Sequence, residues 1–492
     1  MIDTAALREK VLDLAIRGKL VPQDPTDEPA SVLLERIHEQ KLQMVREGKL
    51  KAKDVKDDTI IFKGDDNCYY EKFSDGTIKN IQDEIPFDLP YGWSWCRLKC
   101  ICPYGECDNV ECSEIKNDDW ILDLEDIEKD SGKILAFAKK SDKNSISTKH
   151  KFYQGQLLYS KLRPYLNKVV IAPKAGYCTS EILPLLFWGD IDVHYMQMYL
   201  MSNVFLSYTD KISYGVKMPR LGTADGKQAL IALPPNNEQK LIAKTFQDIL
   251  PALETIKTEQ CALEDIINLL KSKVLELAIQ GKLVPQDEND EPANVLLERI
   301  RTERKAKLGK KYVESYIFKG DDNCYYENNV NNPVEIPFIL PKNWAFSRLA
   351  DIAWLEDGIK IDGEQLPYLD AKTIRGKQTA SMLSCGKAIE KGMQVILVDG
   401  ENSGEVFEVP YRGYIGSTFK VLQVSYGIEK SYVKLILDFY KNLFKDNKTG
   451  SAIPHLNKKI FKSLIVAIPP VSEQKSIVEK VNLVTAILKG GD

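Results

Sequence analysis

Apolar residues recur at alternating steps of three and four positions along the segment that follows Glu238. The positions of this seam are Ile242, Phe246, Ile249, Leu253, Ile256, Gln260, Leu263, Ile267, Leu270, Val274 and Leu277. A heptad seam of this length, with Gln260 as its one polar member, is typical of a coiled-coil helix. Pro251 within the seam predicts a kink or a join, and Gly281 with Pro285 beyond it predicts the end of the helix.

The chain carries the same sequence blocks twice. They recur in order: residues 7–37 as 270–300, 61–71 as 317–327, 84–98 as 335–349, and 232–240 as 467–475. The second block, IFKGDDNCYYE, returns without a change, whereas residues 98–231 and 349–466 diverge strongly. The repeats predict two copies of one module, whose variable regions share a fold but differ in surface chemistry. That pattern suits recognition of two different targets, because a duplicated enzyme site would be expected to repeat its polar residues.

The second copy of the long helix is split between the two ends of the chain. The first half of the helix, Ile242 to Leu253, has its repeat near the end of the chain, at Ile477, Val481, Val484 and Leu488. The last part of the helix, Leu270 to Leu277, has its repeat near the start of the chain, at Leu7, Val11 and Leu14. Because the two pieces continue one heptad phase, we expect them to form halves of one helix. The modules would then close a ring, with the ends Met1 and Asp492 near each other and the two long helices antiparallel. Two independent amphipathic segments are the alternative.

The predicted fold class is α+β, with two modules related by a pseudo-two-fold axis. Short apolar runs between Gly, Pro and Asn residues predict strands at 156–160, 168–172 and 394–398. We expect helical regions at 1–58, 236–315 and 471–492, and β-rich domains at 59–235 and 316–470.

Composition indicates an ordinary globular protein. The 492 residues, 43% hydrophobic and 28% charged, suggest roughly three domains. No apolar run approaches the ~18 residues that span a bilayer, and residues 1–10 contain no apolar signal core, so we expect a cytoplasmic protein. The cysteines follow no disulfide framework, and the cluster Cys96, Cys100, Cys102, Cys107 and Cys112 lacks the CxxC spacing of a zinc site.

The net charge of −4 conceals an uneven distribution of charged residues. Residues 104–130 carry eleven acidic and two basic side chains, whereas 138–174 carry nine basic and one acidic. Tyr153, Tyr159 and Tyr165 lie within the basic stretch. Basic side chains interleaved with aromatic and amide ones suit contact with nucleic-acid phosphates and base edges. A solvated basic surface is the alternative explanation.

Motifs of catalysis and cofactor binding are absent from the sequence. It has no GxxxxGK[ST] loop, GxGxxG, HExxH or methyltransferase NPPY-type motif. Glu238-Gln239-Lys240 resembles a nuclease fragment, but it opens a predicted helix behind Asn237, where a capping role is expected. We therefore expect no catalytic residue, no cofactor and no metal.

The repeated blocks LxxKVLxLAIxGKLVPQDxxDEPAxVLLERI, IFKGDDNCYYE, IPFxLPxxWxxxRL and PPxxEQK resemble the specificity subunit of type I restriction-modification systems. The resemblance covers essentially the whole chain. It implies a non-catalytic subunit in which the β-rich domains are target recognition domains, each reading half of a bipartite, asymmetric site in double-stranded DNA. The helical conserved regions would dock two modification subunits, which carry adenine-N6 methyltransferase chemistry. Restriction subunits, which add ATP-driven translocation and cleavage, would complete the complex.

We select candidate DNA-binding residues from basic, aromatic and amide side chains in predicted loops. In the first domain they are Lys161, Arg163, Tyr165, Lys168, Lys217 and Arg220. In the second they are Arg375, Lys377, His455, Asn457 and Lys458. Arg163 precedes Pro164, which holds the backbone, so we expect it to pair with guanine and Lys168 to contact a phosphate.

The second domain departs from the first in this loop. Val398, Gly400 and Glu405 replace Lys161, Arg163 and Lys168, which weakens the expectation of DNA contact there. Two other functions remain as alternatives. A self-sufficient restriction-methylation enzyme would need a methyltransferase or nuclease motif, and a scaffold that binds only protein would not need the basic stretch.

Overall fold

The structure, a computed structural model, describes residues 2–143, 146–215, 217–328, 332–449, 454–488 and 490. The chain divides into two compact units, Met1–Cys261 and Ala262–Asp492. Met1 and Asp492, which the circular arrangement would bring together, lie outside the described residues. Within the described ranges, no helix is both long enough and apolar enough to cross a membrane.

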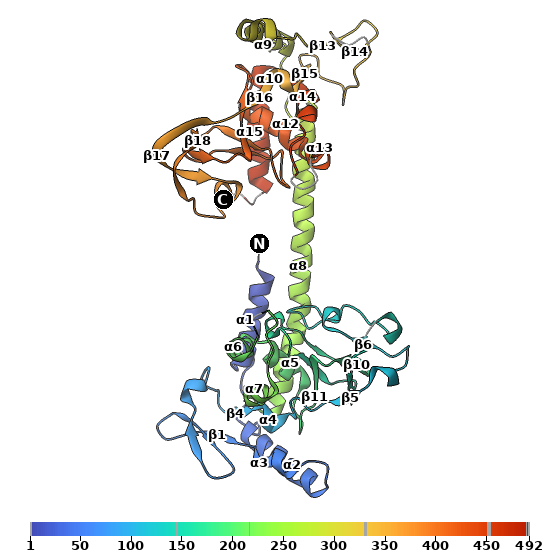
Figure 1. The fold of residues 1–492 in the computed structure, drawn as a ribbon, viewed down its shortest axis with the longest axis vertical. Helices are drawn as coiled ribbons and strands as arrows, with labels where there is room; N and C mark the ends of the chain where they lie inside the picture. Colours follow the sequence, from blue (N-terminus) through green and yellow to red (C-terminus); the bar gives the residue numbers. More distant parts are fainter. Residues whose placement is uncertain are drawn as a thin grey trace. The chain divides into compact units, whose positions relative to one another are not determined.

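The predicted long helix is present as α8 (Asn236–Ile279; Figure 1). It ends where the sequence predicts, since Gly281 has a φ of 67° and the Lys282 N–H donates to the Leu277 carbonyl at 2.8 Å. Pro251 lies inside the helix and marks no join. Its position is exposed, so water can satisfy the carbonyl that the missing proline N–H leaves free.

Helix α8 is buried near its ends, and the middle of its seam is exposed. Ile242 is 0% exposed in the core of the first unit, and Ile279 is 0% exposed in the core of the second. Between them, Leu263 is 50% and Leu270 44% exposed. The middle stretch therefore presents apolar surface of the kind that packs against another helix.

The first unit begins with helices and a small antiparallel sheet. The helices are α1 (Thr4–Ile16), α2 (Ala30–Arg46) and α3 (Ala52–Lys56), and the sheet has the order β1 (Ile60–Lys63), β2 (Tyr69–Lys72), β3 (Ile78–Asn80). Strand β4 (Ser94–Arg97), followed by α4 (Leu98–Ile101), pairs antiparallel with β12 (Leu230–Leu233). This pair joins the two ends of the variable region.

After α4, the described residues of the variable region of the first unit contain two sheets and three α-helices. One sheet has the order β5 (Asp108–Val110), β7 (Lys149–Phe152), β10 (Gly176–Thr179), β6 (Ile121–Leu122). The other has the order β11 (Ile182–Leu185), β8 (Leu157–Ser160), β9 (Val169–Ile171). The helices are α5 (Val193–Met201), α6 (Asn203–Ile212) and α7 (Thr223–Gln228). The predicted strands at 156–160 and 168–172 correspond to β8 and β9.

The second unit has a similar order of elements, although its described residues contain no counterpart of α3 or β3. It contains α9 (Ala293–Leu308), the hairpin β13 (Ile317–Lys319) and β14 (Tyr325–Glu327), α10 (Leu349–Ile352), and β15 (Ala345–Arg348) paired with β23 (Ile465–Ile468). One sheet has the order β16 (Ala353–Glu356), β22 (Phe419–Val424), β19 (Gln394–Leu397), β20 (Val406–Glu408). Strands β17 (Ile359–Leu369), β18 (Met382–Ile389) and β21 (Gly413–Ile415) form a closed barrel. The other helices of the second unit are α11 (Ala371–Ile374), α12 (Lys430–Phe439), α13 (Lys441–Asp446), α14 (Lys458–Ser463) and α15 (Val471–Leu488).

Strand registers repeat between the two variable regions. The pairing of Tyr159 with Val169 in β8–β9 recurs as Ile396 with Val406 in β19–β20. Other pairs recur in equivalent register as well, for example Ile182–Ser160 as Phe419–Leu397 and Tyr177–Lys151 as Tyr414–Ala388. The variable regions therefore share strand pairings although their sequences diverge.

A buried tryptophan–glutamate contact fixes the start of each helix that follows the variable region. Trp93 Nε1 donates to Glu238 at 2.9 Å, and Trp344 Nε1 donates to Glu473 at 2.8 Å. Burial raises the pKa of both carboxyl groups, that of Glu473 to about 7. Glu238, the residue that resembled a nuclease fragment, thus has a structural partner in the first turn of α8.

The clustered cysteines of the first unit lie mostly in its interior. Cys96, Cys100 and Cys102 are buried, and burial raises the pKa of each thiol. In the ranges that the structure describes, no group of His, Cys, Asp and Glu side chains is arranged to hold a metal ion.

Candidate nucleic-acid interface

Two loops of the first unit are tied together by main-chain hydrogen bonds. The first loop connects β8 to β9, and the second connects α6 to α7. The Arg163 N–H donates to the Pro219 carbonyl at 2.7 Å, and the Leu221 N–H donates to the Lys161 carbonyl at 3.0 Å. Arg220 forms isolated β-bridges with both Leu162 and Tyr214. We call residues 161–168 and 213–221, without Val216, the first paired-loop frame.

The second unit repeats this frame bond for bond. The Gly400 N–H donates to the Pro454 carbonyl at 2.7 Å, and the Leu456 N–H donates to the Val398 carbonyl at 2.8 Å. His455 forms the two equivalent bridges, with Asp399 and Thr449. Residues 398–405 with 449 and 454–457 form the second paired-loop frame, whose remaining loop positions lie outside the described residues.

Each frame is also fixed in the same way to the residue that precedes the neighbouring strand, β11 or β22. The Lys161 N–H donates to the Glu181 carbonyl at 3.0 Å, and the Val398 N–H donates to the Thr418 carbonyl at 2.8 Å. The main chain is therefore equivalent in the two frames, while the side chains differ. The substitutions from first to second frame are Lys161 to Val398, Leu162 to Asp399, Arg163 to Gly400, Tyr214 to Thr449 and Arg220 to His455.

Arg163 is held in a backbone conformation that its side chain does not favour. Its φ is 50° and its ψ 61°, in the left-handed region, and it precedes the short helix Pro164–Leu166. Its counterpart Gly400 has a φ of 100°. A non-glycine residue in this region costs about 1–2 kcal/mol, and such strain clusters at functional sites. The Arg163 Nε is also buried without a hydrogen-bond partner among the described residues.

The other candidates on the first loop are in different environments. Tyr165 is 49% exposed, and Lys161 is half-buried. Lys168 directly precedes β9 in the sequence. Its Nζ donates to the Leu124 carbonyl at 2.6 Å. Burial lowers the pKa of its ammonium group. Lys168 is thus tied to the protein, and its contact with a phosphate stays a prediction.

Arg220 and His455 occupy the same place in the two frames, and an acid fixes each of them. Arg220 donates from Nε and Nη2 to Glu181 at 3.1 Å and 3.0 Å, and these hydrogen bonds raise the pKa of the guanidinium. The Nδ1 of His455 lies 2.6 Å from Asp399 Oδ1. Sequence reasoning missed both acids, because an acid does not stand out in a search for basic side chains.

The candidates of the second unit fall into two groups. His455, Asn457 and Lys458 line one cavity of about 590 Å³, together with Asp399 and Lys420. Asn457 is the N-cap of α14, and its Oδ1 accepts from the N–H groups of Lys459 at 3.1 Å and Ile460 at 3.3 Å.

Arg375 and Lys377 come from a separate segment between α11 and β18. Arg375 pairs with Glu405 of the second paired-loop frame, and its guanidinium lies 5.2 Å from the centre of the Phe407 ring. Lys377 is exposed, as Lys217 is in the first unit. Arg375 therefore borders the second frame, in which Glu405 stands where the first frame has Lys168.

Comparison with known proteins supports the resemblance found in the repeated blocks. A family model described as the type I restriction modification DNA specificity domain matches residues 341–490. The EcoAI specificity subunit of Escherichia coli is 24% identical over 97% of this chain and 88% of its own length. The EcoEI specificity subunit of Escherichia coli is 27% identical over 70% of this chain, and the match spans 61% of that relative.

A solved structure from a study of the assembly and conformational transition of the type I R-M system has a similar fold. It has a TM-score of 0.55 at 15% identity, over 82% of this chain and 93% of that one. These matches make the chain similar to the type I DNA specificity domain over residues 341–490 and to specificity subunits of type I restriction enzymes over most of its length.

Proposed function

We propose that this chain reads a bipartite, asymmetric target in double-stranded DNA, with one paired-loop frame on each half. The observation that carries the proposal is that one set of main-chain bonds holds two different sets of side chains. A frame that is constant in the backbone and variable in its side chains suits recognition of two different base sequences. The similarity of the chain to the type I DNA specificity domain and to the EcoAI specificity subunit supports the same function.

The side chains of the first frame suit guanine and phosphate contacts. The Arg220 guanidinium is aligned by Glu181, and an aligned guanidinium can form a bidentate pair with guanine O6 and N7. Lys161 and Lys217 supply positive charge near phosphates, and the exposed Tyr165 adds a hydroxyl for the same purpose. Arg163 is the second candidate for a guanine contact.

The second frame presents different hydrogen-bonding groups. With Nδ1–H donated to Asp399, a neutral His455 ring keeps its Nε2 as an acceptor, which suits the amino group of adenine or cytosine. Lys420 and Lys458 line the same cavity and can reach a phosphate. We infer that the second half of the target differs in base sequence from the first.

The remaining parts have roles that the family resemblance implies. We propose that residues 59–235 and 316–470 are the recognition domains and that 1–58, 236–315 and 471–492 form antiparallel helical regions. The exposed middle of the α8 seam supports helix pairing there. These regions would dock two modification subunits and the restriction subunits, in the cytoplasm where the DNA lies.

A domain exchange tests the division of labour. Residues 98–231 are replaced by the equivalent region of a relative with another target, and the methylated sequence is determined genome-wide. One half of the sequence should change while the other half and the binding of partner subunits are kept. If both halves change together, the two frames do not read separately. A purified complex that shifts no genomic fragment in a gel would favour the scaffold that binds only protein.

A further inference from the structure

A cavity lies in the first unit between helix α2 and the strands β1 and β4. Its volume is about 560 Å³, which is in the range of small-molecule sites. Its apolar lining includes Leu34, Val55, Phe73 and Trp95. Part of this lining comes from α3 and from the residues that follow β2, where the described residues of the second unit have no counterpart of α3 or β3. Segments that are not repeated thus help to build the cavity.

The equivalent place in the second unit is filled by side chains of the chain itself. The cavity there has a volume of only about 10 Å³. Arg301 stands where the first unit has His38, and Tyr316 stands where it has Ile60. The Arg301 guanidinium lies 5.0 Å from the centre of the Tyr316 ring. A cation stacked on an aromatic ring therefore fits this place in the fold.

The first cavity is lined by a residue with a buried, unpartnered hydrogen-bond donor. Trp95 is 1% exposed, and its Nε1 forms no hydrogen bond among the described residues. An unpaired buried N–H group is destabilising, and an oxygen of a ligand can restore its hydrogen bond. The second unit has Phe346, which carries no polar side-chain atom, at the same position. The donor is therefore specific to the unit that has the larger cavity.

The rim of the cavity is acidic. Its lining holds one ammonium group and three carboxylates, on Lys72, Glu35, Glu39 and Asp58. Asp58 already accepts a hydrogen bond from the Nζ of Lys41. Glu35 and Glu39 have exposed positions on α2 and form no ion pair within the part of the chain that the structure describes. The rim therefore favours a positively charged ligand.

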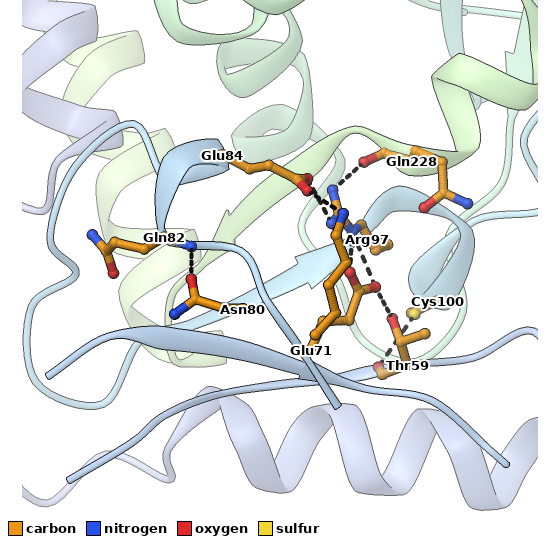
Figure 2. A network of polar contacts seen from close by, with 9 residues as sticks. Thr59, Glu71, Asn80, Gln82, Glu84, Arg97, Cys100 and Gln228 are labelled. Carbon is orange, nitrogen blue, oxygen red and sulfur yellow. Dashed lines mark hydrogen bonds and ion pairs between the residues drawn. The ribbon is translucent and has the colours of Figure 1, made fainter. Parts of the chain in front are cut away.

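One wall of the cavity is held in place by a buried polar network. Figure 2 shows Thr59 and Cys100, which line the cavity, within this network. The Thr59 hydroxyl donates to Glu71 at 2.6 Å, and Glu71 accepts from Arg97 at 2.7 Å. Arg97 donates in turn to the Gln228 carbonyl at 2.8 Å. Because these bonds fix buried side chains, this wall should keep its shape without a ligand.

We propose that the cavity binds one small aromatic amine from solution, with its ammonium group at Glu35 and Glu39 and an oxygen on its ring at the Nε1 of Trp95. The ligand takes the place that Arg301 and Tyr316 fill in the second unit. Its ring packs against the apolar lining, and its charge faces the acidic rim. No residue of the first paired-loop frame lines the cavity, so this binding site is separate from the proposed reading of DNA.

Tyramine is the probe, because it combines an ammonium group, an aromatic ring and a hydroxyl oxygen. Its binding to the full chain is measured by isothermal titration calorimetry and by saturation-transfer NMR, and we expect one tyramine per chain. Phloretate, which has the same ring with a carboxylate in place of the amine, should bind at least about tenfold more weakly. Phenethylamine, which lacks the hydroxyl, should bind about two- to tenfold more weakly than tyramine.

Substitutions assign the binding to this cavity. Trp95→Phe, a change that the second unit carries at the same position, should abolish the difference between tyramine and phenethylamine. His38→Arg combined with Ile60→Tyr introduces the pair that fills the second unit and should weaken tyramine at least about tenfold. Glu35→Gln should weaken tyramine about two- to fivefold. Glu298→Gln is the matched control, because it makes the same change at the repeat position on α9 and should leave tyramine binding unchanged.

Thermal unfolding and binding of a specific DNA duplex show whether each variant keeps its fold. The proposal is supported if tyramine binds the parent and the control alike and the folded double variant loses it. If the double variant unfolds, the comparison of tyramine with phenethylamine in Trp95→Phe decides instead. The proposal is overturned if the parent does not bind tyramine at millimolar concentration, if phloretate binds as tightly, or if the double variant binds tyramine like the parent. Each of these failures would leave the proposed reading of DNA intact, since the duplex is measured separately.

Discussion

Replacing Arg163 should change stability and DNA affinity in opposite directions. In Arg163→Gly, the left-handed backbone is relieved, because glycine adopts a φ of 50° without strain. The gain is about 1–2 kcal/mol, offset by about 0.5–1 kcal/mol for the greater freedom of glycine in the unfolded chain. Removal of the buried, unpartnered Nε adds a further gain of about 1 kcal/mol. We expect a net stabilisation of about 1–2.5 kcal/mol.

The companion variant Arg163→Ala separates the two effects. Alanine lacks the side chain but keeps the backbone strain, so it should be less stable than Arg163→Gly by about 0.5–1 kcal/mol. For a unit of this size, that is a difference in Tm of about 1–4 °C. Both variants should lose about 1–3 kcal/mol of affinity for the specific duplex and little for a scrambled one.

The assays are thermal unfolding of the free chain and DNA binding as a function of salt. Equal stabilities of the glycine and alanine variants would refute the strain argument. Parental binding of both duplexes by Arg163→Ala would instead remove this loop from the reading surface.

Three further predictions follow from other parts of the molecule. Lys168→Ala should weaken specific and scrambled DNA alike and lower the salt dependence by about one counterion, measured as the slope of log affinity against log salt; an unchanged slope would leave Lys168 with only its bond to the Leu124 carbonyl. Because the pKa of Glu473 is raised to about 7 in the folded chain, the folded state holds this proton more tightly, and the free energy of unfolding should fall as pH rises from about 5 through 7. Urea unfolding of Glu473→Gln should show a fall that is smaller by about 1–2 kcal/mol over this range. Parallel pH profiles for the variant and the parent would contradict this prediction. Inserting one heptad into the exposed middle of α8 should lengthen the DNA spacer by about three base pairs, since seven helical residues add about 10 Å; a methylated target with the parental spacer would contradict this.

Local pattern was enough to predict the long helix and three strands of the variable regions. The heptad seam and Gly281 predicted α8 and its end, and the apolar run at 394–398 predicted β19. Local pattern could not predict which distant segments pair, because such pairing depends on tertiary packing. The bridge between Leu162 and Arg220 is one example, and the bond from Lys168 to the Leu124 carbonyl is another.

The candidate site was predictable in part for the same reason. A search for basic side chains found Arg220 and His455 but passed over Glu181 and Asp399, which align them. The charge pattern of the sequence favours DNA contact by the first unit. The equivalence of the second frame to the first is visible only in its main-chain bonds.

Main-chain bonding of the frames has a consequence for how new specificities arise. The amide and carbonyl groups that join the two loops are the same for every residue type except proline, which lacks the N–H. Substitutions at Lys161, Leu162 or Tyr214 therefore leave those bonds in place and should alter folding free energy little. Single mutations can therefore change the side chains that contact bases without compensating mutations elsewhere in the chain. Selected libraries at these positions should accordingly yield folded chains with new half-sites at high frequency.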